Sequence, residues 1–457
     1  FQIDNFLSLF LNIAPYTMSL DKLSQTFNLQ KSKREQDNII NGCKSEYNKY
    51  LQRLAEFCIY LYNFDETSKK RAFDWLYLAI RFNFDKVKMR HDKKSVADEG
   101  YMLTLLNLCL ILFFTGNDNY SKFIFSTVSK IDPNFCLSKD KIKFDVLERA
   151  NPEIVKVALT SEDEIRGLIP YDPTPETQLF FITEMIMKIS LPLFWNEIEK
   201  LFDEHARLKG TGNKKDPILR LSDNDIIRCL AMAEVNYLNE YFAKLYLQFS
   251  EVAIFLTFSL NNKKYSREEL GKNSESINYI EYLDDFFYHV NEKDNFALSL
   301  LPNMIFENVI TTAKYVKEYL SNELINNISS TKAIIYFSLL FSCNNCLIQN
   351  PHFRMQIFEI MEHFLYISKK DKSTSYSRMF NLLQDRFMKE TLIQSILRVF
   401  IDAENLGTSN QYYERFSVRY KILHLIDNIK ICSAKFFDDN FKIYTNQHGS
   451  ECTEMLY

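Results

Sequence analysis

Apolar residues recur along most of the chain with the spacing of amphipathic helices. Residues 302–320 carry apolar side chains at steps of 4, 4, 3 and 4: Ile305, Val309, Ala313, Val316 and Leu320. A second stripe, in residues 353–365, consists of Phe353, Ile357, Ile360 and Phe364. Positions three and four apart lie on one face of a helix, so both segments are predicted to be helices with one buried side.

Helix-start signals agree with these stripes. Asn350 stands directly before Pro351, and Thr174 before Pro175, so each pair offers a capping side chain followed by a proline at the first helical position. Ser266 with Glu269 has the spacing of a capping box. These signals predict helices that begin near residues 175, 267 and 351.

Strand patterns are scarce by comparison. Two short β-prone runs, residues 123–128 and 333–336, lie within longer apolar segments and are predicted to be helical. The chain has only 9 Gly and 10 Pro, roughly a third of average usage, which indicates few tight turns. No motif repeats at a fixed period, and polar joins are predicted at residues 30–37, 208–216, 261–274 and 369–377. The pattern predicts an all-α fold, an elongated armadillo- or HEAT-like helical-repeat solenoid.

Charge and cysteine usage narrow the function classes. The net charge of -4 and the pI near 6.1 are not typical of a nucleic-acid binder, and the short basic clusters at 31–34, 69–71 and 369–372 are interpreted as solvated. Nine scattered cysteines indicate a reducing compartment rather than a disulfide framework. The most apolar run, residues 101–115, is shorter than the about 20 residues of a spanning helix, so it is predicted to be buried. We expect a soluble, intracellular protein without a signal peptide, and its start at Phe1 suggests a fragment.

The search for catalytic motifs gives only weak candidates. Cys343 and Cys346 form a single CxxC, whereas a zinc site needs four ligands, and His352 is the nearest histidine. Residues 210–215 resemble a phosphate loop faintly but lack its spacing, so a flexible loop is the better interpretation. The sequence therefore predicts no catalytic residue, no cofactor and no metal site.

One stretch is more distinctive. Residues 402–420, DAENLGTSNQYYERFSVRY, closely resemble a signature of the U-box ubiquitin-chain elongation factors, which has an acidic pair, a glycine turn, an aromatic pair, and then Phe and Arg-Tyr. Asn405 and Leu406 depart from the family's usual Phe-Thr. Further segments follow in the family's order: 74–80, 95–103, 131–133, 173–181, 301–308 and 350–354.

The resemblance, over residues 5 to 427, implies the helical core of a factor that extends ubiquitin chains on substrates already carrying ubiquitin, for proteasomal degradation. It implies a cytoplasmic and nuclear protein whose partners are a ubiquitin-conjugating enzyme, a segregase-type AAA ATPase, shuttle proteins with ubiquitin-like domains, and ubiquitinated substrates. In that family a C-terminal U-box recruits the conjugating enzyme, and catalysis is mainly by proximity.

The family pattern is lost after residue 430. We therefore expect residues 1–430 to be the core and residues 431–457 to be a segment of unclear assignment without a U-box. A full-length parent would be a ubiquitin-protein ligase, and this piece alone would be inactive. We expect a monomer that binds neither nucleic acid nor membrane. The alternative is a non-catalytic helical-repeat adaptor that binds other proteins.

The signature residues have two open interpretations. Arg415 and Arg419 are predicted either to bridge Asp402 or Glu404 and so lock two helices, or to form part of a partner-binding surface. Tyr413, Phe416 and Tyr420, at steps of 3 and 4, are predicted to be core residues, as are Phe353 and Ile357. Arg354 could be structural or partner-facing.

Overall fold

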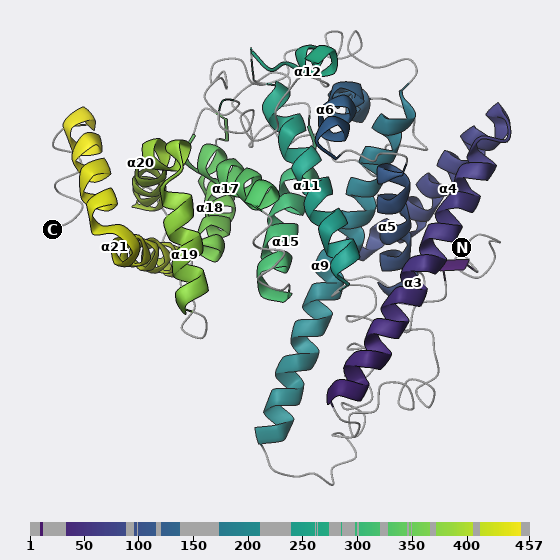
Figure 1. Cartoon of the computed structure of the whole chain (residues 1–457), viewed down its shortest axis with the longest axis horizontal. Coiled ribbons are helices and arrows are strands. Elements are labelled where there is room, and N and C mark those ends of the chain that lie inside the picture. The colour runs from purple at the N-terminus through teal and green to yellow at the C-terminus, as the bar shows by residue number, and fades with distance from the viewer. Residues whose placement is uncertain are drawn as a thin grey trace. The chain divides into compact units, whose positions relative to one another are not determined.

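In the computed structural model, the chain divides into two compact units (Figure 1). The described residues are 10–11, 33–87, 96–97, 99–115, 120–137, 173–210, 239–260, 262, 264–273, 285, 298, 301–319, 328–344, 347–348, 350–365, 372–404 and 412–448. Unit 1 comprises residues 1–120, 134–148 and 169–249, and unit 2 comprises residues 121–133, 149–168 and 250–457.

Unit 1 is built around a helix that is buried on nearly all sides. Its elements are α3 (Lys33–Tyr62), α4 (Glu66–Asn83), the 3-10 turns η2 (Phe84–Val87) and η3 (Pro133–Leu137), α5 (Glu99–Phe114), α9 (Pro175–Gly210) and the first part of α11 (Glu240–Leu260). The central helix, α5, packs against both α3 and α9, and α4 packs against α3 and α9. All residues from Tyr101 to Leu110 are buried, as predicted for this apolar run.

A polar network crosses the core of unit 1. The Tyr47 hydroxyl donates to Thr104 Oγ1 at 3.2 Å and accepts from Asn107 Nδ2 at 3.4 Å, while the Tyr246 hydroxyl donates to Asn107 Oδ1 at 2.5 Å. Burial raises the pKa of Tyr47 to about 12, although these hydrogen bonds act in the opposite direction. Because the phenols stay neutral, the network joins α3, α5 and α11 without burying a charge.

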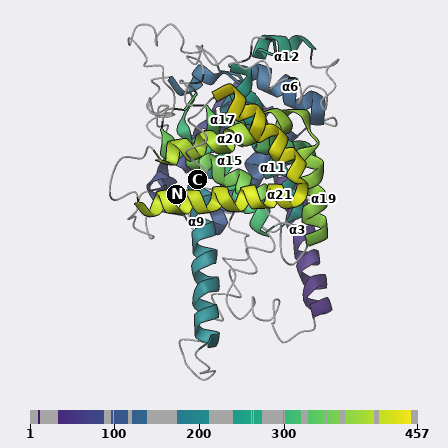
Figure 2. The ribbon, with the colours of Figure 1, turned by 90° about the vertical axis from the view of Figure 1, so that its left-hand side faces the viewer.

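Unit 2 is a stack of helices that pack on near neighbours in the sequence. Its elements are α6 (Tyr120–Lys130, from Ser121), the rest of α11, α12 (Arg267–Asn273), α15 (Asn303–Tyr319), α17 (Ile328–Cys343), α18 (Pro351–Phe364), α19 (Lys372–Leu383), α20 (Arg386–Glu404) and α21 (Tyr412–His448). Within it α17 packs on α18 and α20, α15 on α18, and α21 on α18, α19 and α20. In Figure 2 the yellow helix α21 lies toward the viewer in front of α20 and α17.

Aromatic side chains fill the centre of unit 2. Phe258 of α11 stacks on Phe341 of α17 at a ring distance of 5.4 Å, and Phe306 of α15 meets Phe341 edge-on at 5.1 Å. Phe337 lies 5.7 Å from Phe306, and all four rings are buried. Offset and edge-on pairs at these distances stabilise a core beyond the area that they bury. The abundant phenylalanine of the sequence therefore serves here as core.

The predicted helix starts are confirmed. The Asn350 side chain accepts from the backbone N–H groups of His352 and Phe353 and so caps α18. Thr174 accepts from the Thr177 N–H at 3.1 Å at the start of α9, and Ser266 accepts from the Glu269 N–H at 3.4 Å before α12. Short side chains with an oxygen satisfy helix N–H groups that have no partner within the helix.

The prediction of an all-α fold is confirmed: the described residues form α-helices and 3-10 turns and contain no β-strand. Both β-prone runs lie in helices, residues 123–128 in α6 and residues 333–336 in α17. The armadillo or HEAT type of the repeat, and its elongation, stay predictions. Within the described part of the chain, no helix is both long and apolar enough to cross a membrane.

Some predicted joins were too long. The stretch 369–377 was predicted as a polar join, but α19 begins inside it at Lys372, and α3 likewise begins at Lys33 within the predicted join 30–37. At the C-terminal end, α21 continues past residue 430 to His448, with non-helical backbone angles at Ser433 (φ -160°, ψ 90°) that separate two helical stretches.

Candidate partner-binding sites

Arg354 lies in the interior of unit 2 and joins two helices. Its Nε and Nη2 atoms lie 3.1 and 2.8 Å from Oδ2 of Asp402 on α20, and its Nη1 donates to the Ile348 carbonyl oxygen. The Arg354 side chain is 5% exposed and that of Asp402 is 25% exposed. A guanidinium presents several donors in a fixed plane, which suits a site shared by a carboxylate and a carbonyl. Asp402 therefore connects α20 to α18 through Arg354.

Two signature residues that were predicted to be core are at the surface, and that prediction is wrong. Phe416 is 64% exposed and Tyr420 is 65% exposed. The reason is that α21 packs on unit 2 through a different face, whose buried residues are Val418, Ile422, Leu425, Ile426 and Ile429. Of the other two, Ile357 is fully buried as predicted, and Phe353 is half-buried.

Of the remaining signature residues, Arg419 is the one whose side chain lies within the described part of the chain. Arg419 is half-buried on α21. The side chains of Glu404, Tyr413 and Arg415 lie outside the described residues, as does the glycine turn at Gly407. A bridge from Arg415 or Arg419 to the acidic pair therefore stays a prediction.

A second charged cluster, which the sequence reasoning missed, holds α21 in place. Glu359 of α18 lies 3.1 Å from Nζ of Lys314 on α15 and 2.5 Å from Nζ of Lys421 on α21. Burial by itself raises the pKa of Glu359, but the hydrogen bond from Lys421 and the charge of Lys314 outweigh burial and lower it below its ordinary value. These residues are 45 and 62 positions apart in sequence, so no local pattern could have revealed them.

Asp385 forms a third polar contact between helices. Its carboxylate caps α20 by accepting from the N–H groups of Phe387 and Met388, and it also accepts from the Tyr336 hydroxyl. The ammonium of Lys332 on α17 lies 2.7 Å from Oδ2 of Asp385, with both side chains 13% exposed. Together the three clusters fix α15, α17, α18, α20 and α21 against one another.

The weak metal and phosphate candidates gain no support. Cys343 is half-buried and donates from its Sγ to the Leu340 carbonyl, while Cys346 lies outside the described residues. Among the residues that the structure describes, no group of three or more His, Cys, Asp or Glu could hold a metal ion. Gly210 is the last residue of α9, and residues 211–215 lie outside the described part.

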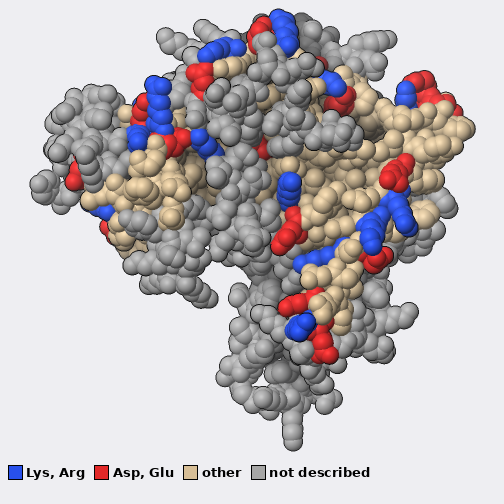
Figure 3. Space-filling view, viewed as in Figure 1, with Lys and Arg blue, Asp and Glu red and all other residues tan. Residues whose placement is uncertain are grey.

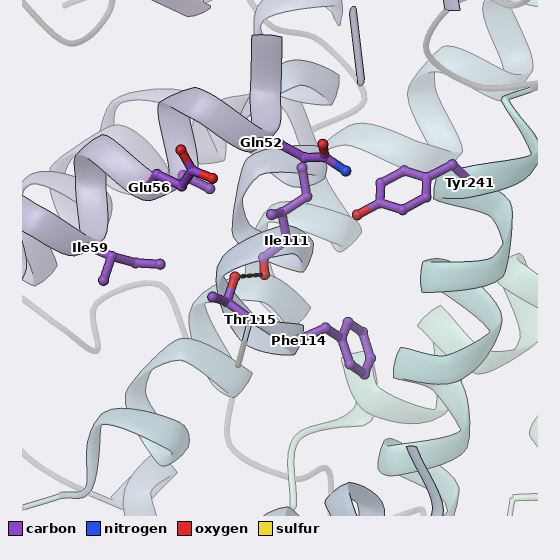
Figure 4. A pocket seen from close by; sticks show the side chains of 8 residues that line it. Gln52, Glu56, Ile59, Ile111, Phe114, Thr115 and Tyr241 are labelled. Atoms are coloured by element: carbon purple, nitrogen blue, oxygen red, sulfur yellow. Dashed lines mark hydrogen bonds between the residues drawn. The ribbon is translucent and has the colours of Figure 1, made fainter. Parts of the chain in front are cut away.

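Unit 1 has a surface hollow between α3, α5 and α11 (Figure 4). Its volume is about 230 Å³, and it is lined by Gln52, Ala55, Glu56, Ile59, Ile111, Phe114, Thr115 and Tyr241. In Figure 4 the Tyr241 hydroxyl points toward the side chains from α3 and α5, and Thr115 Oγ1 donates to the Ile111 carbonyl at 2.6 Å. The hollow is smaller than the about 300–1,000 Å³ of most ligand pockets.

Large apolar side chains are exposed singly on α4 (Phe82) and α19 (Phe380), and in groups in two places in the described part of the chain. Phe57 and Tyr60 at the end of α3, and Phe64 in the turn that follows it, are 39%, 65% and 69% exposed. In Figure 3 the side of unit 1 that carries the α3–α4 hairpin shows a broad area without charged side chains. The second place is the outer side of α21. Exposed apolar residues that gather on one face are typical of protein-binding surfaces.

The fold defines the class of the chain as an all-α protein built from packed helices, with exposed apolar faces. The chain belongs to the family described as the ubiquitin elongating factor core, whose sequence model matches residues 7–450. This match confirms the family that the segment 402–420 indicated, and it is consistent with a role in ubiquitin-chain elongation at the level of the family.

Two curated relatives match parts of this chain at low sequence identity. The chain is 21% identical over 153 residues to the E4 ubiquitin-protein ligase UFD2 of Saccharomyces cerevisiae, a match that covers 33% of this chain and 15% of the yeast protein. It is 25% identical over 91 residues to a probable ubiquitin conjugation factor E4 of Arabidopsis thaliana, a match that covers 20% of this chain and 8% of the plant protein. The matched parts are thus a small fraction of each relative.

Proposed function

We propose that this chain is the scaffold core of a U-box ubiquitin ligase that elongates ubiquitin chains on substrates already carrying ubiquitin, and that it acts in proteasomal degradation. The observation that carries the proposal is the family match over residues 7–450. The names of the yeast and plant relatives, a ubiquitin-protein ligase and a ubiquitin conjugation factor, support the same activity.

The scaffold role rests on how unit 2 is held together. Three polar clusters, centred on Arg354, Glu359 and Asp385, join helices that do not directly follow one another along the chain. Side-chain bridges of this kind restrict sliding between packed helices. A rigid body of this kind suits a protein that acts by holding two others at a fixed separation, since catalysis by proximity depends on geometry rather than on a nucleophile.

The proposed partners follow from the family. They are ubiquitinated substrates, a ubiquitin-conjugating enzyme bound through a U-box, a segregase-type AAA ATPase and shuttle proteins with ubiquitin-like domains, in the cytoplasm and nucleus. The exposed aromatic residues at the end of α3 and in the turn after it, Phe57, Tyr60 and Phe64, form a part of unit 1 that suits such contacts.

A reconstituted elongation assay tests the proposal. The chain alone, the chain fused after Tyr457 to a U-box domain, and the same U-box alone would each be given activating enzyme, conjugating enzyme and a substrate carrying one ubiquitin. The proposal expects the fusion to lengthen chains much faster than the U-box alone, and the unfused chain to be inactive. A fusion no faster than the U-box alone would favour a non-catalytic helical-repeat adaptor instead.

A further inference from the structure

The first part of α21, up to Ser433, has apolar residues on two opposite faces. One face packs on unit 2 through buried Val418, Ile422 and Leu425. The other face is exposed, with Phe416, Tyr420, Leu423 and Ile431 at 64%, 65%, 53% and 58%. We call this exposed face, together with the exposed Asp427, the outer α21 stripe.

The spacing of the outer α21 stripe is that of a helix–helix contact. Phe416, Tyr420, Leu423, Asp427 and Ile431 follow one another at steps of 4, 3, 4 and 4 residues. Steps of three and four form a continuous seam along a helix, as in a two-helix interface. The stripe occupies about 24 Å of helix at the usual rise of 1.5 Å per residue. Within unit 2, α21 lies toward the viewer in Figure 2, on the outer side of α20.

We propose that the outer α21 stripe binds the same stripe of a second copy of this chain, with the two helices antiparallel and Leu423 at the two-fold axis. This reversible dimer takes the place of the monomer that the sequence led us to expect. The inference goes beyond the proposed function and does not depend on it. It rests on the symmetry of the stripe about its centre.

The apolar ends of the stripe complement each other. Phe416 stands seven residues before Leu423, and Ile431 stands eight residues after it. In an antiparallel pair centred on Leu423, Phe416 of each copy therefore meets Ile431 of the other. A two-fold interface requires that every such contact occur twice, and this one does.

The polar positions of the stripe complement each other in the same register. Tyr420 stands three residues before Leu423, and Asp427 stands four residues after it. The Tyr420 hydroxyl of one copy would donate to the Asp427 carboxylate of the other, and the reverse, which gives two charge-assisted hydrogen bonds. A parallel pair would instead place the two Asp427 carboxylates opposite each other. Like charges in contact are unfavourable, so the antiparallel pair is selected.

The size of the stripe sets the strength of the dimer. Stable interfaces bury about 1,200–2,000 Å² in total, and a single pair of short helices lies at or below the low end of that range. We therefore expect a reversible dimer with a dissociation constant in the micromolar range rather than a permanent one.

Sedimentation equilibrium of the full chain over a concentration series tests this inference. The wild-type chain is expected to show monomer and dimer, and Leu423→Asp, which places two carboxylates at the axis, should weaken dimerisation at least tenfold. Phe82→Asp is the matched control, because Phe82 is also an exposed aromatic residue (54%) but lies on α4, so its dimerisation should equal that of the wild type.

Cysteine cross-linking tests the register independently of that variant. Leu423→Cys should form a disulfide with its own copy under mild oxidation, since residues at a two-fold axis come within the about 4.4–6.8 Å Cα separation that a disulfide needs. Phe416→Cys alone should show no more cross-linking than the wild-type chain, whereas the double variant Phe416→Cys/Ile431→Cys should cross-link.

Three results would overturn the inference. One is a chain that stays monomeric at all concentrations, which would mean that another protein or another segment covers the stripe. Another is a dimer that Leu423→Asp weakens no more than Phe82→Asp does. The last is a cross-link of Phe416→Cys alone that is as efficient as that of the double variant.

Discussion

Replacing Asp402 by asparagine keeps the shape of the side chain but removes the negative charge that Arg354 binds. The Arg354 side chain is only 5% exposed, and two of its nitrogens lie 2.8 and 3.1 Å from Asp402 Oδ2. The guanidinium carries a positive charge, and the substitution leaves that charge inside unit 2 without its carboxylate partner. Asp402→Asn is therefore expected to destabilise unit 2.

The size of the effect follows from the exposure of each partner. Removing one member of a fully buried ion pair costs about 3–5 kcal/mol, and a hydrogen bond to a charged group contributes about 1.5–3 kcal/mol. Asp402 is 25% exposed, so water screens part of the interaction. We therefore expect Asp402→Asn to lower the free energy of unfolding by about 2–3 kcal/mol.

The same helix supplies a matched control. Glu390 of α20 pairs with Arg386 at 3.0 Å, but these side chains are 48% and 78% exposed. Glu390→Gln makes the same chemical change as Asp402→Asn, and exposed pairs of this spacing contribute only about 0.3–0.5 kcal/mol. Urea unfolding of both variants would be followed by circular dichroism rather than fluorescence, because both tryptophans, Trp75 and Trp195, are in unit 1. Equal losses in the two variants would refute the buried pair.

Three further predictions concern single contacts. The pKa of Glu359 is lowered, so its stabilisation is present above its ordinary pKa of 4.5 and is lost as the pH falls through the lower, folded value. Glu359→Gln should therefore be less stable than wild type in urea at neutral pH, and the deficit should shrink as the pH is lowered below 4.5. A deficit that does not change with pH would contradict this. A Cβ at Gly271 would lie 3.0 Å from Ser129 Cβ, so Gly271→Ala should destabilise the folded chain by about 1 kcal/mol. A Cβ at Gly42 would have nothing within 4 Å, so Gly42→Ala should stabilise the folded chain by up to about 1 kcal/mol. Thermal melts in which both variants shift in the same direction would contradict this. Asn350→Ala removes the cap of α18 and should cost about 1 kcal/mol in urea unfolding, and no change would mean that the cap is dispensable.

Much of the fold could be predicted because helices follow local rules. The stripe from Ile305 to Val316 and the caps at Thr174 and Asn350 depend on residues within a few positions of one another, and each lies where it was expected. The stretch 369–377 was harder, because Lys and Ser are polar enough for a join but acceptable in the first turns of a helix.

The site could be predicted only in part. Apolar steps on α21 define two faces, and the sequence alone does not say which one meets the rest of the chain, so Phe416 and Tyr420 were assigned to the wrong side. Arg354 and Asp402 were both singled out, but as separate features, because they are 48 positions apart and only the packing of α18 on α20 brings them together. The sequence therefore revealed the helices but not the contacts between residues that are distant in sequence.

The central claim is that this chain holds substrates that already carry ubiquitin. It is tested most directly by titrating the purified chain into a fluorescently labelled substrate, in a form with one ubiquitin and in a form with none, while fluorescence anisotropy is measured. Our account predicts saturable binding of the ubiquitin-bearing form and much weaker binding of the bare one. Equal binding of the two forms, or none of either, would contradict it.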